Sequence, residues 1–424
     1  MNPTKKGWLK DFLDYRKQYF IKNQEFKKRK MGQDPDHSFY GIVQPTGLMY
    51  GYPVNLPSEI DSAQWDNQDR VKVLLVNSLI NVAELYSNKK VETADEFYQL
   101  MLEAVQEMNR YYEKVFPELS INTKSWFGKK KEVLPLAESI LSKRVETTFT
   151  SKSNFWLRFF FRSQLFLDVY IFGQWTHTEP DEVLEGFFKN EKEELSFNAL
   201  KVMAAAAHAN KTIEEEERNL FNIFIESAGV SGDKKRVARE YLQHGLEIQD
   251  IPLDETDPWV IRKFFLELAL LTAWSDKKVE EVELEFLREL NRSLGFSEDD
   301  LEKSMMAVEG FILENWSHLD ELQNKKDYEQ VSNEFINHLK SVTSKYQKRL
   351  LNEMNKDVEL CKLLKKGSVK ELNDDEKHIV ETKLINVLRN LPVFSVIALP
   401  KNFLYYEHVI RAIPKEVMSE IVSD

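Results

Sequence analysis

The residue types that most often carry out chemistry are few in this sequence and lie far apart. No two of the eight histidines stand at metal-ligand spacing. The sequence lacks the HExxH, GxSxG and GxGxxG motifs, a Walker A loop and an EF-hand loop. His208 is interpreted as a packed side chain. We therefore expect a protein that is not an enzyme and has no cofactor, apart from the divalent cation considered below.

The single cysteine, Cys361, predicts a buried structural thiol, since Leu360, Leu363 and Leu364 surround it in the sequence. One cysteine forms neither an internal disulfide nor a cysteine-based zinc site, and it fits a reducing compartment. Residues 1–30 carry ten Lys and Arg against three acids, which does not resemble a secretion signal. We expect a cytoplasmic protein, with peripheral attachment to the inner membrane as the alternative.

Basic side chains gather between Lys340 and Lys370, where nine basic residues face three acidic ones, although the whole chain carries a net charge of −12. A cationic face of this kind attracts RNA phosphates, and such binding weakens steeply with salt. The predicted ribosome-binding residues are Lys340, Lys345, Lys348, Arg349, Lys362, Lys365 and Lys366.

A basic amphipathic helix is predicted within residues 5–30, because apolar residues recur there at helical spacing. Such a helix can lie in an anionic membrane interface, with Trp8 and Phe12 in the lipid and Lys10 and Lys17 at the headgroups. The alternative is an arm that docks on the body of its own protein.

The segment from Phe155 to Trp175 has nine aromatic residues in 21 positions, close to the length of a membrane-spanning helix. Arg158, Arg162 and Asp168 interrupt it, and each charge would cost roughly 2.5–3.5 kcal/mol near a bilayer centre. We therefore predict a helix buried in a protein core, with an interfacial or spanning helix as the alternatives.

The elements that carry these residues are predicted to be helices. Glycine (14) and proline (13) are scarce among the 424 residues, helix formers dominate, and 42% of the side chains are apolar. We expect an all-α array of helical bundles. Its predicted parts are a basic arm (1–31), an ordered Gly/Pro/Tyr-rich loop (32–57), an N-terminal helical domain (58–190), a double repeat (191–320) and a C-terminal helical region (321–424).

An internal repeat of 66 residues organises the middle of the chain. Leu200–Asp233 aligns with Leu266–Asp299 without a gap, and ten of the 34 positions are identical. Each copy is predicted to be a helix, a short turn and a second helix that ends at a glycine, Gly229 or Gly295. The serine two residues later is expected to cap the next helix.

The turn of each copy carries a motif with the same spacing: Asn210, Ile213 and Glu217 in the first and Asp276, Val279 and Glu283 in the second. This spacing resembles the DGx(I/V)xxxE signature of TerB-like domains, the helical module of tellurite resistance and stress response. The resemblance covers about 120 residues. It implies a two-repeat helical fold whose acidic face binds divalent cations, with Asn210, Glu217, Asp276 and Glu283 as ligands. The alternative is that these residues cap helices and cover a solvated face.

Apolar residues and prolines near the end of the chain follow a second recognisable order: Leu391, Pro392, Phe394, Val396 and Pro400, then Ile413, Pro414, Met418 and Ser419. This order resembles the segment that enters the ribosome-binding region of Letm-type proteins. TerB-like repeats ahead of a Letm-like tail resemble a bacterial Letm-related family associated with biofilm formation. The resemblance implies a docking region, but cation exchange is not carried over, because Lys401, Glu407, His408 and Arg411 stand where that family is strongly apolar.

These features together predict a non-enzymatic helical scaffold that binds a protein partner and serves envelope or biofilm physiology. The first alternative is a ribosome-binding factor that uses the basic face. The second is a stress-response protein attached to a membrane surface. Neither DNA nor a small-molecule substrate is expected.

Overall fold

The computed structural model describes residues 1–22, 34–50, 60–119, 132–148, 155–178, 186–209, 218, 221–222, 224–226, 228–253, 256–274, 281–316, 325–400 and 403–423. All regular secondary structure in these ranges is helical, which confirms the predicted all-α class. The chain forms two compact units. Unit 1 comprises Met1–Pro252 and Pro258–Val260, and unit 2 comprises Leu253–Asp257 and Ile261–Asp424.

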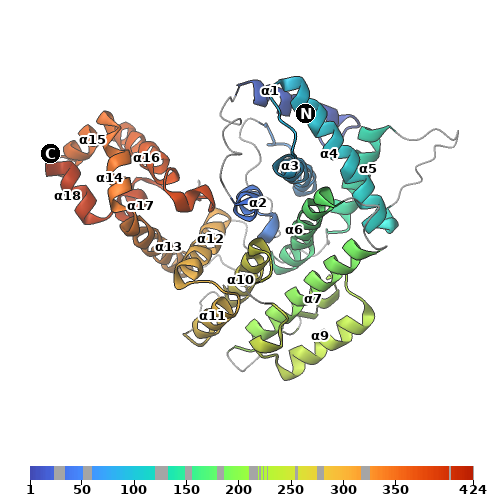
Figure 1. Ribbon diagram of the computed structural model, residues 1–424. Helices are drawn as coiled ribbons and strands as arrows, with labels where there is room; N and C mark the ends of the chain where they lie inside the picture. The colour runs from blue at the N-terminus through green and yellow to red at the C-terminus, as the bar shows by residue number, and fades with distance from the viewer. Residues whose placement is uncertain are drawn as a thin grey trace. The chain divides into compact units, whose positions relative to one another are not determined.

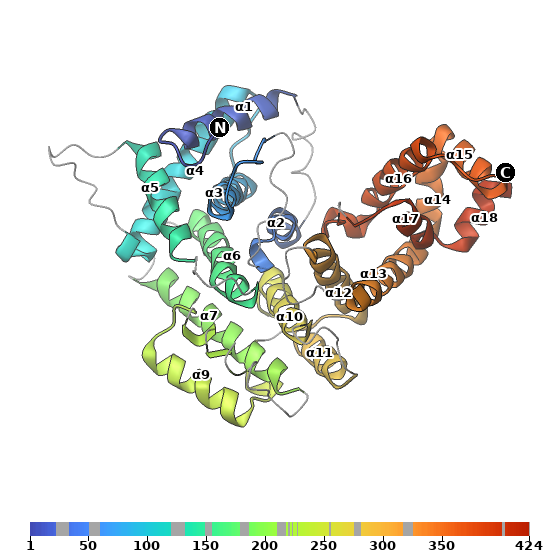
Figure 2. The ribbon, with the colours of Figure 1, turned by 180° about the vertical axis from the view of Figure 1, so that it is seen from behind.

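Unit 1 is built around one central helix, α3, which packs against α2, α4, α5 and α6 (Figure 1). Helices α7 and α9 lie side by side (Figure 2). The α-helices of this unit are α1 (Trp8–Lys22), α2 (Pro35–Val43), α3 (Asn67–Tyr86), α4 (Ala94–Val115), α5 (Val133–Glu146), α6 (Phe155–His177), α7 (Phe187–Ala207) and α9 (Gly232–His244). The 3-10 turns are η2 (Gln44–Thr46), η3 (Leu48–Tyr50), η4 (Pro117–Leu119) and η5 (Ile248–Asp250).

The amino-terminal helix α1 is docked on its own protein. Trp8 and Phe12 are 2% and 0% exposed, and the helix packs on α4 and α5. The carboxylate of Glu138 accepts hydrogen bonds from the backbone N–H groups of Gly7 and Leu9, at 3.1 and 2.9 Å, and so satisfies donors at the start of the helix. The two aromatic rings predicted to enter a membrane therefore face the protein core.

The two lysines predicted to lie at a membrane surface differ in their surroundings. Lys10 is exposed, whereas the Lys17 ammonium lies 2.5 Å from the carboxylate of Asp95 on α4. The ion pair between Lys17 and Asp95 therefore holds α1 against α4 at the surface of unit 1. This agrees with the alternative of an arm docked on its own protein.

Helix α6 is buried, as its sequence predicts. Its described side chains begin at Arg162, and those from Arg162 to Gly173 are all buried, Asp168 completely. None of the described helices combines the length and the apolar character that crossing a membrane requires. Two of the charges that interrupt the aromatic run, Arg162 and Asp168, therefore lie within a protein core.

The Gly/Pro/Tyr-rich segment departs from the predicted loop. Its described part, residues 34–50, forms α2, η2 and η3, with Phe39, Tyr40 and Tyr50 buried as anchors. Pro35 stands in the first turn of α2, where its missing N–H costs no hydrogen bond, and the side chain of Asp34 caps the helix. The proline therefore starts a helix here and does not interrupt one.

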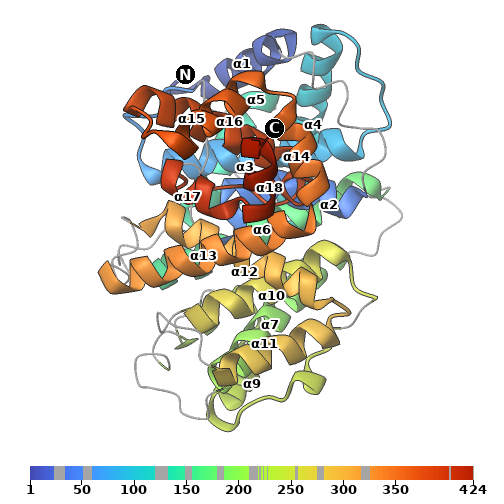
Figure 3. The same ribbon diagram turned by 90° about the vertical axis from the view of Figure 1, so that its left-hand side faces the viewer.

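Unit 2 is a helical assembly in which α13 packs on α12 and α17, while α15 and α16 pack together (Figure 3). Three helices cover residues 327–366, because breaks fall at Tyr346 and Asp357. The elements are α10 (Trp259–Ala273, all but its first two residues in this unit), α11 (Glu281–Ser293), α12 (Glu298–Glu314), α13 (Lys325–Lys345), α14 (Gln347–Asn355), α15 (Val358–Val369), α16 (Asp374–Arg389), η8 (Pro392–Ser395), α17 (Tyr406–Ala412) and α18 (Lys415–Ser423).

The predicted helix ends are formed where the structure describes them. Gly229 and Gly295 have φ angles of 66° and 69°, the left-handed conformation expected of them. Ser297 makes a capping box with Asp300, whereas Ser231 stands at the start of α9 without a side-chain capping bond. The two copies of the repeat belong to different compact units.

A half-buried histidine and a buried carboxylate join α12 to α13. The Nδ1 atom of His338 lies 2.8 Å from Oε2 of Glu309, which is 0% exposed. Burial opposes a charged imidazolium, but the hydrogen bond and charge of Glu309 outweigh it and raise the pKa of His338. Burial also raises the pKa of Glu309. The pair therefore retains a proton more strongly than an exposed histidine does.

We expect His338→Gln to lower the free energy of unfolding more at about pH 6 than at about pH 9. The stabilisation by protonated His338 is complete below the ordinary pKa of 6.5 and disappears as the pH rises through the raised pKa of the folded state. Urea unfolding of the full chain, followed by circular dichroism, measures this. The exposed His378→Gln is the control, and an equal loss at both pH values would contradict the prediction.

We expect Asn373→Ala to lower the free energy of unfolding by about 1 kcal/mol. Asn373 forms a capping box with Glu376 at the start of α16, so its loss leaves a backbone donor without its partner. Asn386→Ala, at an exposed position within the same helix, is the matched control and should change little. Thermal unfolding of both variants checks this, and equal melting temperatures would argue against the cap.

Candidate functional site

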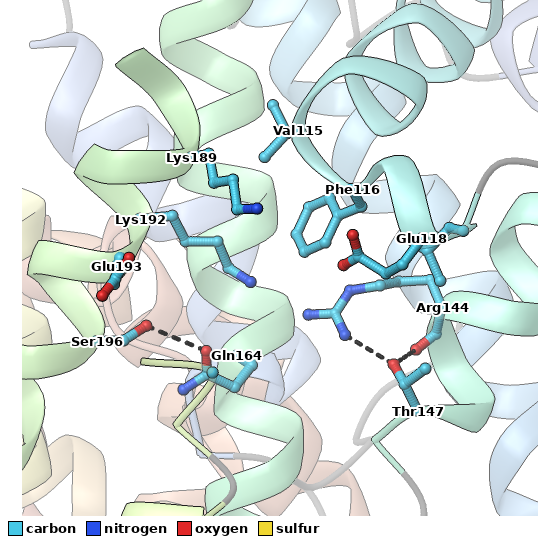
Figure 4. Close-up of a pocket in the computed structure, with 12 residues that line it drawn as sticks. Val115, Phe116, Glu118, Arg144, Thr147, Gln164, Lys189, Lys192, Glu193 and Ser196 are labelled. Carbon is cyan, nitrogen blue, oxygen red and sulfur yellow. Dashed lines mark hydrogen bonds between the residues drawn. The ribbon is translucent and has the colours of Figure 1, made fainter. Parts of the chain in front are cut away.

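A cavity of about 260 Å³ lies within unit 1. Its walls come from the end of α4 with η4 on one side and from α5, α6 and α7 on the others. Lys189 and Lys192 extend from α7 towards Phe116 and Glu118 on the opposite wall, with Arg144 and Thr147 beside them (Figure 4). The cavity therefore combines cationic side chains with an aromatic surface.

The wall is supported by a buried ion cluster centred on Asp168 of α6. Its carboxylate accepts hydrogen bonds from Nε and Nη2 of Arg144, at 2.5 and 3.1 Å. The Lys192 ammonium lies 3.1 Å from Oδ1, and the hydroxyl of Tyr112 lies 3.3 Å from Oδ2. Four helices, α4 to α7, are joined through this one carboxylate. Two positive charges share a single negative charge.

Burial and charge act in opposite directions on these groups. Burial alone would raise the pKa of Asp168, but the charges of Arg144 and Lys192 outweigh it and hold that pKa below its usual value. For Lys192 burial prevails and lowers the pKa to about 8, despite the attraction of Asp168. Asp168 is thus ionised at neutral pH, and Lys192 loses its proton more easily than an ordinary lysine.

The ring of Phe116 gives further support to both cations. Its centroid lies 4.3 Å from the Lys192 ammonium and 4.9 Å from the guanidinium carbon of Arg144. Both distances are within the range of cation–π attraction, which favours a positive charge without adding an anion. The ring of Phe116 therefore helps to stabilise two positive charges beside a single buried carboxylate.

The acidic residues at the cavity mouth neutralise only part of the positive charge of its Lys and Arg side chains. Glu193 accepts a hydrogen bond from the backbone N–H of Ser231, at 3.0 Å, and lies 3.4 Å from the ammonium of Lys234. The bond from Ser231 lowers the pKa of Glu193. Glu118 and Lys189 are exposed at the rim. The carboxylate of Glu193 therefore already binds residues at the start of α9. The Lys and Arg side chains remain the main hydrogen-bond donors of the cavity.

The cavity offers hydrogen-bond donors to an anionic group. Lys189, Lys192 and Arg144 supply N–H donors and positive charge, which suit an oxyanion. In the described part of the chain, no three His, Cys, Asp or Glu side chains come together as metal ligands. The cavity is thus suited to holding a charged group.

Only one of the four predicted cation ligands lies in the described part of the chain. Asn210, Glu217 and Asp276 lie outside the described residues. Glu283 lies on the buried face of α11 and is 5% exposed. A cation site at these four positions therefore stays a prediction.

The predicted ribosome-binding residues divide into two groups. Lys345 lies 2.5 Å from both Asp299 and Glu302, and Lys366 forms an ion pair with Glu376. The other five have no ion-pair partner among the described residues: Lys348, Arg349 and Lys362, which are exposed, and Lys340 and Lys365, which are half-buried. The basic stretch is therefore partly neutralised.

Two further side chains of the sequence analysis have structural roles. The Nε2 atom of His208 lies 2.8 Å from the carbonyl oxygen of Leu242, and its ring packs beside Gly245. Cys361 is half-buried, and burial raises its pKa, which keeps it a thiol at neutral pH.

One member of the ion cluster, Asp168, could be recognised from the sequence. Asp168 stands out as an acid in an aromatic helix, and such a charge needs a partner when the helix is buried. Arg144 and Lys192 carry no local signal, since each is 24 residues away.

We expect Asp168→Asn to lower the free energy of unfolding by about 3–5 kcal/mol, because it leaves two buried cations without their carboxylate. Asp95→Asn, which breaks the exposed contact with Lys17, is the control and should change little. Chemical unfolding of both variants measures the difference. A loss for Asp168→Asn no larger than that of the control would show that the cluster does not stabilise the fold.

Comparison with known proteins finds partial similarity to co-chaperones. The protein named Co-chaperone protein DjlA from Vibrio vulnificus strain YJ016 is 28% identical over 127 residues, which cover 28% of this chain and 44% of the relative. Its counterparts from Vibrio cholerae and Photobacterium profundum are each 30% identical, over 127 and 125 residues. These cover 28% and 27% of this chain, and 44% and 45% of those relatives.

The chain spans less than half the length of the curated relatives it matches. No family model matches the chain, and the comparison with solved structures gave no match. The chain is therefore an all-helical protein with partial similarity to co-chaperones.

Proposed function

We propose that this chain is a non-enzymatic helical binding protein whose partner is a chaperone or a chaperone-bound protein. The observation that carries the proposal is the similarity to DjlA, which is by name a co-chaperone. The matched 127 residues are about as long as the double repeat predicted at 191–320. We propose that this repeat is the shared part, and that the C-terminal region (321–424) supplies a docking region behind it.

The surface of the described residues favours recognition through charge. Large apolar side chains that are well exposed stand singly there, as Phe187 does on α7 and Val358 and Val369 do on α15. Isolated apolar residues are ordinary on a protein surface and do not mark an interface. Charged residues flank some of them in the sequence, as Asp357 and Glu359 flank Val358, so we propose that the partner is bound mainly by polar contacts and that its binding weakens with salt.

We expect the purified full chain to bind an ATP-dependent chaperone of its source cell and to change the yield of a refolded reporter enzyme. Calorimetry with each purified chaperone measures binding, and recovered reporter activity measures the effect. Serum albumin at the same concentration is the control for nonspecific protection. Absence of binding to every chaperone at micromolar concentration, together with an unchanged yield, would end this proposal.

A ribosome-binding role is the second candidate, and the unpaired cations of α14 and α15 favour it. Lys348→Gln combined with Arg349→Gln should reduce the slope of log affinity against log salt by about two. The matched control combines Lys345→Gln and Lys366→Gln, which remove the same charge from side chains already held in ion pairs. Cosedimentation with ribosomes at several salt concentrations measures both. No cosedimentation at low salt would exclude this candidate.

A further inference from the structure

The buried ion cluster beside the cavity of unit 1 holds two cations and one carboxylate, while two further acids, Glu118 and Glu193, line the cavity itself. Asp168 is shared between Arg144, which makes two hydrogen bonds to it, and Lys192, which makes one contact. Nη1 of Arg144 donates a hydrogen bond to the hydroxyl of Thr147, at 2.9 Å. The Lys192 ammonium has three donors and only one contact with a carboxylate, so it can give hydrogen bonds to a ligand. We propose that this cavity binds a carboxylate, with Lys192 as the principal contact and Lys189 as the second.

The charge balance favours a single negative charge. Arg144, Lys192 and Asp168 together carry one net positive charge when Lys192 is protonated. Glu118 and Glu193, which also line the cavity, oppose a second negative charge on the ligand. A monoanionic carboxylate matches this balance, whereas a dianionic phosphate or sulfate meets repulsion from both acids.

The size and lining of the cavity define the rest of the ligand. Its volume, about 260 Å³, is slightly below the range of roughly 300–1,000 Å³ typical of pockets for drug-sized molecules. Val115, Phe116 and Leu119 form an apolar part of the wall. A carboxylate attached to a short aliphatic or aromatic group therefore fits best. It can be a free small molecule or the carboxyl terminus of a peptide, since both present the same chemistry.

The affinity of this site for a carboxylate should depend on pH, because binding is linked to the protonation of Lys192. The pKa of Lys192 is about 8 in the free protein, and a bound carboxylate favours its charged form. Affinity should therefore be highest below pH 8 and fall as the pH rises above it, with proton uptake on binding near that pH. The charged or titratable groups around Lys192 are Asp168, Arg144, Glu118, Lys189, Glu193, Tyr111 and Tyr112. Burial raises the pKa of both tyrosines well above 10, so they stay protonated throughout this range.

The test is calorimetric titration of the full chain at constant ionic strength. The probes are propionate, benzoate, and N-acetyl-Ala-Phe as the free acid and as the amide. Binding of propionate or benzoate identifies a free small carboxylate as the source, and binding of the peptide acid but not its amide identifies a peptide terminus. Either result supports the proposal. No heat with any acid at millimolar concentration, or equal binding of sulfate, overturns it.

Variants of α7 assign the binding to this cavity. Lys192→Gln should weaken binding about tenfold or more and abolish proton uptake, because it removes a charged donor. Lys201→Gln is the matched control, since Lys201 is on the same helix, contacts Phe197 and does not line the cavity. Lys189→Ala, at an exposed position, gives an independent variant that should fold and bind more weakly. Equal binding by the wild type and Lys189→Ala, with no pH dependence, would refute the site even if Lys192→Gln fails to fold.

The inference does not depend on the proposed function. It rests on the geometry of unit 1 alone, and its experiment contains no chaperone and no ribosome. A protein that binds a chaperone but no carboxylate would refute the inference only, and the reverse result would refute the proposed function only.

Discussion

The carboxylate of Asp168 is the interaction on which unit 1 depends. It has no solvent exposure, and it contacts side chains from α4, α5 and α7 at once. An ionised group in a protein interior loses several kcal/mol of hydration, and only close, well-directed partners offset this. The positions of four helices must therefore agree before the cluster forms, which favours one arrangement of the bundle over other compact packings.

The same cluster creates the cavity beside it. One carboxylate neutralises the charge of only one of the two cations. The ring face of Phe116 stabilises both cations through cation–π attraction. A closely packed apolar residue in place of Lys192 would close the core more completely, yet the helix carries an ammonium there. Core stability and a charged concave surface thus come from the same side chains, and their properties cannot be changed independently.

Local features of this fold could be predicted from sequence, and long-range ones could not. The capping boxes at Ser297 and Asn373 join residues three positions apart, so a short motif contains all the information. The helix at Pro35 was missed because proline is equally suited to a break and to a first helical turn. The ion cluster was missed because its partners meet only after α4 to α7 pack together. The described residues also contain just one of the four predicted cation ligands, Glu283.

The hydrogen bonds from Gly7 and Leu9 to Glu138 bear on how the chain is made. A ribosome makes α1 before α5, and the carboxylate that caps α1 is added 129 residues after Leu9. Until α5 has emerged, the apolar face formed by Trp8 and Phe12 has no complete surface to cover it. Helix α1 therefore cannot dock completely until α5 has been made, and the nascent chain passes through a period in which this apolar face is exposed and prone to aggregation.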